Sequence, residues 1–400
     1  MSRPKMQALA LDMGQREHER RRQVRVVEVE RPTEDDLGPG DVLVQIQRAM
    51  FCLTDKEIAS QAGHGVPTEG VDHLGLGPVA LIGHEAGGTI VGAGGEVDPA
   101  RVGQSVALMV REGGDCVACR AGRADMCYRW TEQGEMAEHG IFRLPGWMCS
   151  HAVVPAAGAV PVPEGLAPGL ACFGEPSSIG GKSLCEARIV GQRYPGWGEP
   201  DEQGNRPAAL VLGAGGVGLP TVPVLLSAGF EVVVAAWTRY DPQRPHLKAA
   251  MVERLGARYV STQQTGVARL KEMAPKGRFD IIVDMCGRSD VVAEVMTELC
   301  DPGAVVVLTS ITGGDRRVDF PSDRFLHNIT MNNGTVIGVV NADVSHFEAG
   351  LAGIAWAEQR SPGWTEALIT RRFEGLAEAA AGFWDVMDDP ANIRAAVELG

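Results

Sequence analysis

A glycine-rich turn between an apolar run and a helical segment constrains this chain more than any other feature. The run Ala209-Leu210-Val211-Leu212 leads straight into Gly213-Ala214-Gly215-Gly216-Val217-Gly218. In such a G-x-G-x-x-G turn the first glycine allows the tight bend, the second lets backbone N–H groups approach a pyrophosphate, and the third lets the helix pack on the strand. The sequence therefore predicts a dinucleotide site whose cofactor-binding residues include Gly213, Gly215, Gly216, Val217 and Gly218.

Strands and helices alternate on both sides of this turn. Helices are expected to about residue 228 and at 246–255 and 290–300. Strands are expected at 208–212, 231–236, 281–284, 304–308 and 335–340. This alternation is typical of a parallel, doubly wound sheet, so we predict an α/β fold with a Rossmann domain over residues 187–342.

The N-terminal part has short alternating strands instead. The stretches 24–29 and 42–47 are expected to form antiparallel strands, and glycine-punctuated apolar runs follow at 78–82, 88–92 and 105–110. A chain of 400 residues exceeds the usual single-core limit of about 250–300 residues. We therefore predict a second, mostly β domain over residues 1–186, to which residues 343–400 return with amphipathic helices.

Charge and composition exclude several classes of partner. The chain has 37 basic and 51 acidic residues, a net charge of −14, which argues against a wide nucleic-acid or anionic-lipid surface. No stretch approaches the roughly 18 apolar residues of a membrane span. Nine scattered cysteines suit a reducing compartment better than a disulfide framework. We predict a cytoplasmic protein that acts on a small molecule, with no nucleic-acid or membrane partner.

The residues after the second strand of the doubly wound part bear on the choice of cofactor. NAD enzymes place an acid there for the ribose 2′-hydroxyl, but this chain has Trp237-Thr238-Arg239. Thr238 and Arg239 can bind a 2′-phosphate, and Trp237 or Arg239 can lie against adenine. The sequence favours NADP over NAD. The alternative is that Arg239 is a solvated charge and Asp241 serves the ribose.

Three residues of the β part form a candidate metal set. Cys52, His84 and Glu85 offer a thiolate, an imidazole and a carboxylate. Such a set holds zinc with one coordination position open, the arrangement of a catalytic site. Each residue alone is weak support, because a lone cysteine or histidine is more often a core residue.

The order of these motifs resembles that of the zinc-dependent medium-chain alcohol dehydrogenases. The shared features are Cys52-x-Thr54-Asp55, Gly83-His84-Glu85, a cysteine-bearing lobe, Glu175-Pro176 and the dinucleotide fold. Thr131-Glu132, Glu138-His139 and Gly338-Val339-Val340-Asn341-Ala342 look most like the glucose 1-dehydrogenase branch. The resemblance implies a GroES-like catalytic domain beside the Rossmann domain.

The resemblance also implies roles for individual residues. Cys52 and His84 would bind the catalytic zinc, with Glu85 and Glu175 as further carboxylate ligands. Glu138, Glu175 and Asn341 would contact sugar hydroxyls or the nicotinamide edge. Zinc lowers the pKa of a bound hydroxyl and stabilises the alkoxide from which hydride leaves, and Thr54 would relay the proton.

The lobe departs from the family pattern. Cys116, Cys119 and Cys127 match three of four structural zinc ligands, but Gly113 stands where the first cysteine would be. A closed structural site needs four ligands. Either Asp115 supplies the fourth, or the lobe holds no metal.

The sequence thus predicts an NADP- and zinc-dependent alcohol or polyol dehydrogenase, assembled as a homodimer or homotetramer. Sugars and cyclitols lead the substrates, although Ile179 stands where some relatives have a sugar-binding carboxylate, so glucose itself is doubtful. The alternatives are a reductase of less polar alcohols or ketones, and a catalytically inactive cofactor-binding module. A metal-free quinone or enoyl reductase is disfavoured because it would not need this ligand set.

Two additions and three tryptophans complete the candidates. Long segments at 63–77 and 194–205 are candidates for reshaping the substrate cleft. Trp130, Trp147 and Trp197 either line a pocket or are half-buried surface residues.

Overall fold

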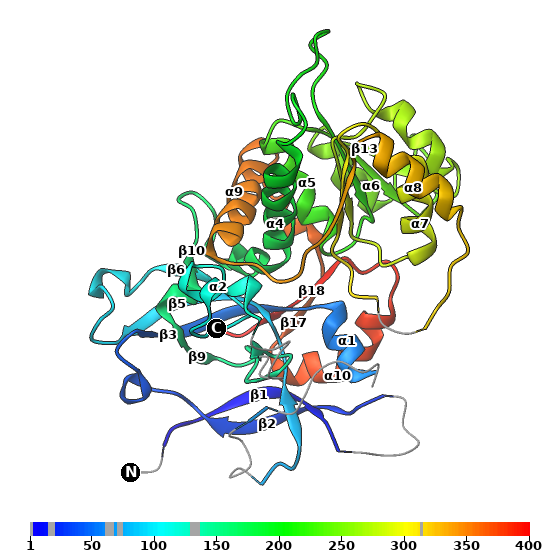
Figure 1. Cartoon of the computed structure of the whole chain (residues 1–400). Helices are drawn as coiled ribbons and strands as arrows, with labels where there is room; N and C mark the ends of the chain where they lie inside the picture. Colours follow the sequence, from blue (N-terminus) through cyan, green and yellow to red (C-terminus); the bar gives the residue numbers. More distant parts are fainter. Residues whose placement is uncertain (1–2, 15–20, 61–67, 70–74, 129–136, 313–314) are drawn as a thin grey trace. The chain divides into compact units, whose positions relative to one another are not determined.

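The computed structural model describes the chain except for residues 1–2, 15–20, 61–67, 70–74, 129–136 and 313–314 (Figure 1). It divides into two compact units. The first contains residues 1–175, 341–351 and 366–400, and the second contains residues 176–340 and 352–365. The domain boundaries at 186 and 343 stay predictions. In the described part of the chain, none of the helices has the length and apolar character that crossing a bilayer requires.

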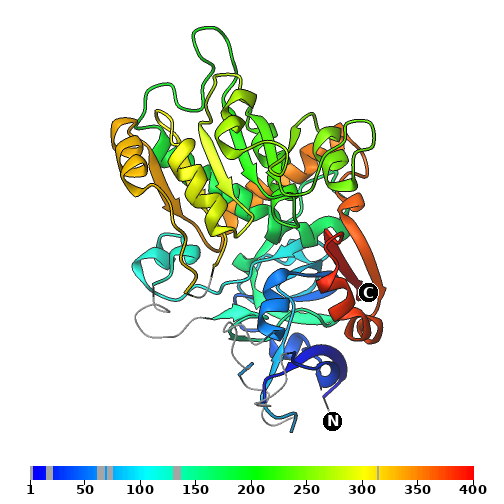
Figure 2. The ribbon, with the colours of Figure 1, turned by 90° about the vertical axis from the view of Figure 1, so that its right-hand side faces the viewer.

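The second unit is built on a six-stranded parallel sheet with the order β13-β12-β11-β14-β15-β16. Its strands are β11 (Ala208–Leu212), β12 (Glu231–Ala236), β13 (Arg258–Ser261), β14 (Ile281–Asp284), β15 (Val305–Leu308) and β16 (Thr335–Gly338). The connecting helices are α5 (Gly218–Ser227), α6 (Leu247–Arg254), α7 (Ser289–Glu298) and α8 (Ser322–Met331). Figure 2 shows helices on both sides of these strands. This is the doubly wound arrangement.

The predicted doubly wound fold is confirmed. β11, β12 and β14 begin and end at the predicted residues, because each contains a continuous apolar run in a sheet covered on both faces. The short strand β13 was not predicted. Pro223 lies inside α5, which nevertheless begins at Gly218.

The first unit is mostly β. Its sheets have the orders β2-β1-β4, β10-β6-β5-β3-β18-β17 with β9 also paired to β3, and β7-β8. The strands of the first part of the chain are β1 (Lys5–Asp12), β2 (Val24–Glu30), β3 (Asp41–Phe51), β4 (Val79–Leu81), β5 (Glu85–Ala93), β6 (Ser105–Leu108), β7 (Glu138–His139), β8 (Arg143–Leu144), β9 (His151–Pro155) and β10 (Ala159–Pro161). The helices here are α1 (Leu53–Ala59), α2 (Val117–Arg120) and α4 (Gly174–Gly191), which continues into the second unit.

The stretches 24–29 and 42–47 are strands, as predicted, but they belong to different sheets. β2 pairs antiparallel with β1, whereas β3 pairs antiparallel with β5, β9 and β18. An alternating pattern identifies a half-buried strand but not its partner, so the sequence left this pairing open.

The C-terminal tail contains more than the predicted helices. α9 (Val344–Arg360) and α10 (Leu376–Asp388) are present, but so are two strands, β17 (Ile369–Glu374) and β18 (Arg394–Glu398). β18 lies between β3 and β17 and is almost entirely buried, so its side chains show no alternation. Its insertion places residues from the end of the chain in the main sheet of the first unit.

Candidate metal and cofactor sites

The strand register of the first unit brings three distant residues to one end of the sheet. Cys52 follows directly after β3, and the pairing of Met50 with Glu85 places the start of β5 beside it. On the other side of β3, Phe51 pairs with Ala395, which follows Arg394 at the start of β18. Antiparallel pairing thus assembles the candidate site.

The predicted ligand set is brought together. The ligand atoms of Cys52, His84 and Glu85 all lie within 4.8 Å of one another. His84 and Glu85 are buried, and Cys52 is partly buried. The Cys52 sulfur lies 3.7 Å from the hydroxyl oxygen of Thr54. These donors fit a zinc ion, because thiolate, imidazole and carboxylate are its usual ligands.

Asp55 supports the two strongest candidate ligands. Its carboxylate is fully buried and accepts the backbone N–H of Cys52 at 2.8 Å. Its Oδ1 lies 3.6 Å from Nδ1 of His84, and among the described residues neither atom has a hydrogen-bond partner. A carboxylate beside one ring nitrogen favours a proton on that nitrogen, which leaves the other nitrogen for a metal. In the sequence, Asp55 stands out only as the last residue of the motif Cys52-x-Thr54-Asp55.

Arg394 was missed altogether. Its Nη1 donates to both carboxylate oxygens of Glu85, at 2.8 and 2.7 Å, and both residues are buried. The two residues are 309 positions apart in sequence, so no local pattern could have paired them. In this structure the Glu85 carboxylate is therefore held by a cation from the chain itself.

Burial and mutual charge shift the pKa values of the candidate ligands. Burial, followed by the charge of Glu85, raises the pKa of Glu175 to about 7. Burial likewise raises the pKa of the Cys52 thiol, with Glu85 adding to it. Burial opposes charge on His84, but Asp55 and then Cys52 outweigh it and raise its pKa well above the usual value. A zinc ion would displace these protons on binding.

Glu138 lies in a second polar cluster of the same unit. Its Oε1 accepts from Nε and Nη2 of Arg111, at 3.0 and 2.7 Å, and from Nδ2 of Asn341 at 2.6 Å. Glu138 and Arg111 are both buried. Asn341 has a positive φ of 58°, a conformation that asparagine tolerates better than most residues. Arg111 was not predicted, although it is a charged residue three positions after the end of β6.

The glycine-rich turn has the geometry its sequence predicts. Gly213 has a φ of +108° and donates its N–H to Ala235 at 2.8 Å. A Cβ at Gly218 would lie 2.0 Å from the Gly213 carbonyl oxygen, so only glycine fits there. A Cβ at Gly215 would meet nothing within 4 Å, which leaves that side of the turn open to a ligand.

The end of β12 presents exposed side chains. Trp237 is 62% exposed, and Thr238 and Arg239 are exposed beside it. Arg239 has no ion-pair partner within the described residues. Arg288, which sequence reasoning missed, lies over the Trp237 ring at 6.0 Å and is held by Asp290 at 2.7 Å.

The three-cysteine lobe also gathers its thiols. The sulfur atoms of Cys116 and Cys119 are 3.4 Å apart, and those of Cys116, Cys119 and Cys127 all lie within 4.8 Å of one another. Backbone N–H groups, that of Cys119 first, lower the pKa of Cys116 to about 7. A Cβ at Gly113 would lie 3.5 Å from the Cys119 sulfur. The position without a cysteine is therefore next to the three thiols.

Several candidates fall elsewhere. Trp130, Thr131 and Glu132 lie outside the described residues, as does most of segment 63–77. Trp147 and Trp197 are buried, and each lines a pocket, which is the first of the two predicted alternatives. Segment 194–205 precedes β11, whereas the glycine-rich turn follows it, so the two lie at opposite ends of that strand.

Comparisons with known proteins agree with this geometry. Residues 38–164 match the alcohol dehydrogenase GroES-like domain, and residues 169–399 match the glucose dehydrogenase C-terminus. The chain is 31% identical to glucose 1-dehydrogenase of Methanocella arvoryzae over 99% of its own length and 100% of that protein's length. It is 32% identical to glucose 1-dehydrogenase of Thermoproteus tenax, covering 84% and 86% of the two chains.

A solved structure extends the match to three dimensions. Haloferax mediterranei glucose dehydrogenase, in complex with NADP, zinc and gluconolactone, superposes with a TM-score of 0.78 at 26% identity, over 99% of both chains. The predicted fold and family are confirmed. The chain belongs to the zinc-dependent medium-chain alcohol dehydrogenases, in their glucose dehydrogenase branch.

Proposed function

We propose that this protein transfers a hydride between NADP and a hydroxyl group of a sugar or cyclitol, or reduces the matching carbonyl compound. Family membership makes it a zinc- and NADP-dependent dehydrogenase. The complex of the Haloferax mediterranei enzyme with NADP, zinc and gluconolactone supports this cofactor pair and a sugar-like substrate. A cytoplasmic location and assembly as a homodimer or homotetramer stay predictions.

The observation that supports a polar substrate is the hydrogen-bonding pattern of the Glu138 carboxylate. Three N–H donors converge on its Oε1, and a carboxylate can only accept hydrogen bonds. Among the described residues, Oε2 has no partner. A substrate hydroxyl can donate to it, whereas an apolar alcohol has no second hydroxyl group to make this bond.

The zinc ion would be held by Cys52 and His84, with Glu85 and Glu175 supplying carboxylate oxygens. When bound, it supplies Lewis-acid chemistry that lowers the pKa of a coordinated hydroxyl. Thr54, whose hydroxyl lies 3.7 Å from the Cys52 sulfur, is positioned to accept and pass on the released proton. Asp55 orients His84, and Arg394 holds Glu85.

A substrate panel tests the proposal. With NADP, we expect aldoses and cyclitols to give kcat/KM values at least about 100-fold above those of apolar secondary alcohols, since an unsatisfied polar group costs several kcal/mol. Glucose is not expected to lead, because Ser177, Ser178 and Ile179 replace the carboxylate that some relatives use.

The variant Glu138→Gln sharpens this test. It removes the charge but keeps the shape, so kcat/KM for polyols should fall about 100-fold while the low activity on apolar alcohols stays unchanged. Equal losses on both substrate types would mean that Glu138 is structural. No turnover with any alcohol or sugar would favour the inactive cofactor-binding module instead.

The cofactor preference is proposed to depend on Arg239 and Thr238, with Trp237 or Arg239 against adenine. Arg239→Ala should raise KM for NADP about tenfold and leave KM for NAD unchanged, because the guanidinium would bind only the 2′-phosphate. Steady-state kinetics with both cofactors measure this. Equal effects on NADP and NAD would remove the argument and favour Asp241 as the ribose contact.

A further inference from the structure

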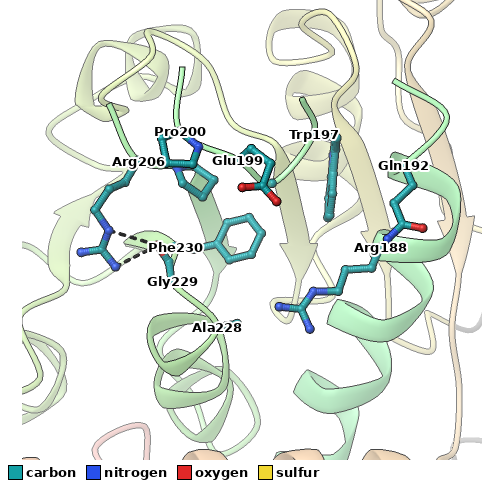
Figure 3. Close-up of a pocket in the computed structure, with 11 residues that line it drawn as sticks. Arg188, Gln192, Trp197, Glu199, Pro200, Arg206, Ala228, Gly229 and Phe230 are labelled. Carbon is teal, nitrogen blue, oxygen red and sulfur yellow. Dashed lines mark hydrogen bonds between the residues drawn. The ribbon is translucent and has the colours of Figure 1, made fainter. Parts of the chain in front are cut away.

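The second unit contains a polar pocket that the proposed function does not use (Figure 3). It is lined by the end of α4, by the added segment before β11, and by the turn after α5. Because the glycine-rich turn follows β11, the pocket and the dinucleotide turn lie at opposite ends of this strand. Its volume of about 370 Å³ falls within the usual range for small-molecule sites, roughly 300–1,000 Å³.

The added segment is firmly anchored. Trp197 is 8% exposed, donates its indole N–H to the carbonyl oxygen of Asp280 at 3.0 Å, and packs edge-on against Phe230 with ring centroids 6.0 Å apart. A Cβ at Gly191 would lie 2.4 Å from the indole, so this tryptophan needs the glycine beneath it. Lys276 donates to the backbone carbonyl of Glu199 at 2.5 Å. The walls of the pocket are therefore fixed before any ligand arrives.

Two arginines give the pocket positive charge. Arg206 donates through Nε and Nη2 to the carbonyl oxygen of Gly229, at 3.1 and 2.8 Å, which orients its guanidinium group. Arg188 comes from the last turn of α4, and Figure 3 shows both guanidinium ends turned toward Ala228 and Gly229. Within the described residues neither arginine has a carboxylate partner, although the chain carries a net charge of −14.

The C-terminal end of α5 repels an anion, but its partial charge is smaller than the positive charge of the two arginines. A helix C-terminus carries a partial negative charge of about half an electron. Arg206 covers the carbonyl of Gly229, and Arg188 adds a second full positive charge. Gln192 and Glu199 also line the pocket and offer an amide and a carboxylate, which bind hydroxyl groups.

We propose that this pocket binds a small organic phosphate that carries hydroxyl groups, such as a sugar phosphate. The phosphate group lies against Arg188, since guanidinium groups match phosphate oxygens in charge and geometry, and Arg206 adds positive charge on the other side of Phe230 (Figure 3). The hydroxyl groups bond to Gln192 and Glu199. The indole of Trp197, which lines the same pocket, contacts the apolar face of the sugar.

Isothermal titration tests the proposal with three probes: inorganic phosphate, glucose 6-phosphate and glucose. The protein is saturated with NADPH, which fills the dinucleotide site and prevents oxidation of the probe. We expect glucose 6-phosphate to bind at least about fivefold more tightly than inorganic phosphate, and glucose not to bind at this pocket. Equal affinities for the two phosphates, or no phosphate binding at millimolar concentrations, would overturn the proposal.

Variants locate the binding. Arg188→Glu should weaken glucose 6-phosphate binding at least about tenfold, because it replaces a charge-assisted contact with repulsion. Arg269→Glu is the matched control, since Arg269 is another exposed arginine of this unit and does not line the pocket. Glu138→Gln should leave the affinity unchanged. Loss in Glu138→Gln but not in Arg188→Glu would place the probe in the proposed substrate site and contradict this inference.

Discussion

Two regions of the first unit gather sulfur ligands, and they are built in different ways. The cluster of Cys52, His84 and Glu85 lies at the end of a sheet, with Asp55 and Arg394 buried behind it. The lobe with Cys116, Cys119 and Cys127 consists of turns and the four-residue helix α2, and much of its surface is exposed. The first region has buried charged partners for its ligands, whereas the second has a neighbouring glycine where a ligand would stand.

This difference matches the different requirements of a catalytic and a structural metal site. A catalytic ligand set must keep its shape while one coordination position exchanges, so it needs support from outside the ligands. A structural site takes its shape from four ligands closing on one ion. Chemistry should therefore depend on the sheet-end cluster, while the lobe should affect stability at most.

The largest expected effect comes from removing one thiol in each region. Cys52→Ala should lower kcat/KM by at least about 1,000-fold, because the reacting hydroxyl loses its Lewis acid, while the Kd for NADP stays within about twofold. Cys119→Ala should keep kcat/KM within about tenfold of the parent. A Cys119→Ala variant as inactive as Cys52→Ala, with its fold intact by circular dichroism, would break the distinction.

The next effect concerns the buried ion pair. Arg394→Met leaves the Glu85 carboxylate buried without its cation and should lower the free energy of unfolding by about 3–5 kcal/mol. Arg120→Met is the control in the lobe. Arg120 is exposed and donates to the carbonyl of Asp115, so its loss should cost about 1 kcal/mol or less. Urea denaturation of both variants measures the contrast, and similar losses would contradict it.

The smallest expected effect comes from adding a fourth thiol to the lobe. Gly113→Cys places a thiol near Cys119, where a Cβ would lie 3.5 Å from the sulfur, and completes a four-thiolate set. We expect its zinc content to rise by about one ion per chain, with kcat/KM unchanged. If the parent lobe already binds zinc as firmly, Asp115 or another group supplies the fourth ligand, and the variant will show no gain in metal.

Much of this was predictable because the signals are local. The strands β11 and β12 and the turn from Gly213 to Gly218 follow from apolar runs and glycines within a few positions. The candidate ligands Cys52 and His84 stand in short motifs. Local sequence also favours NADP, since Thr238 and Arg239 follow β12 directly.

What was missed depends on pairing across long stretches of chain. Arg394 meets Glu85 only because β18 inserts beside β3, and a strand that is buried at all but its last residue shows no alternation to reveal it. Arg111 and Glu138 are 27 positions apart in sequence, and no local pattern links them. The separation of β2 and β3 into two sheets has the same cause, because a strand pattern does not name its partner.

The central claim is that a metal ion sits at the end of β3 and serves the chemistry. The most direct measurement is anomalous X-ray diffraction at the zinc edge on crystals of the protein purified with zinc. The account predicts an anomalous peak at bonding distance, about 2.0–2.3 Å, from the Cys52 sulfur and a His84 ring nitrogen. A peak confined to the three-cysteine lobe, with none beside Cys52, would contradict it.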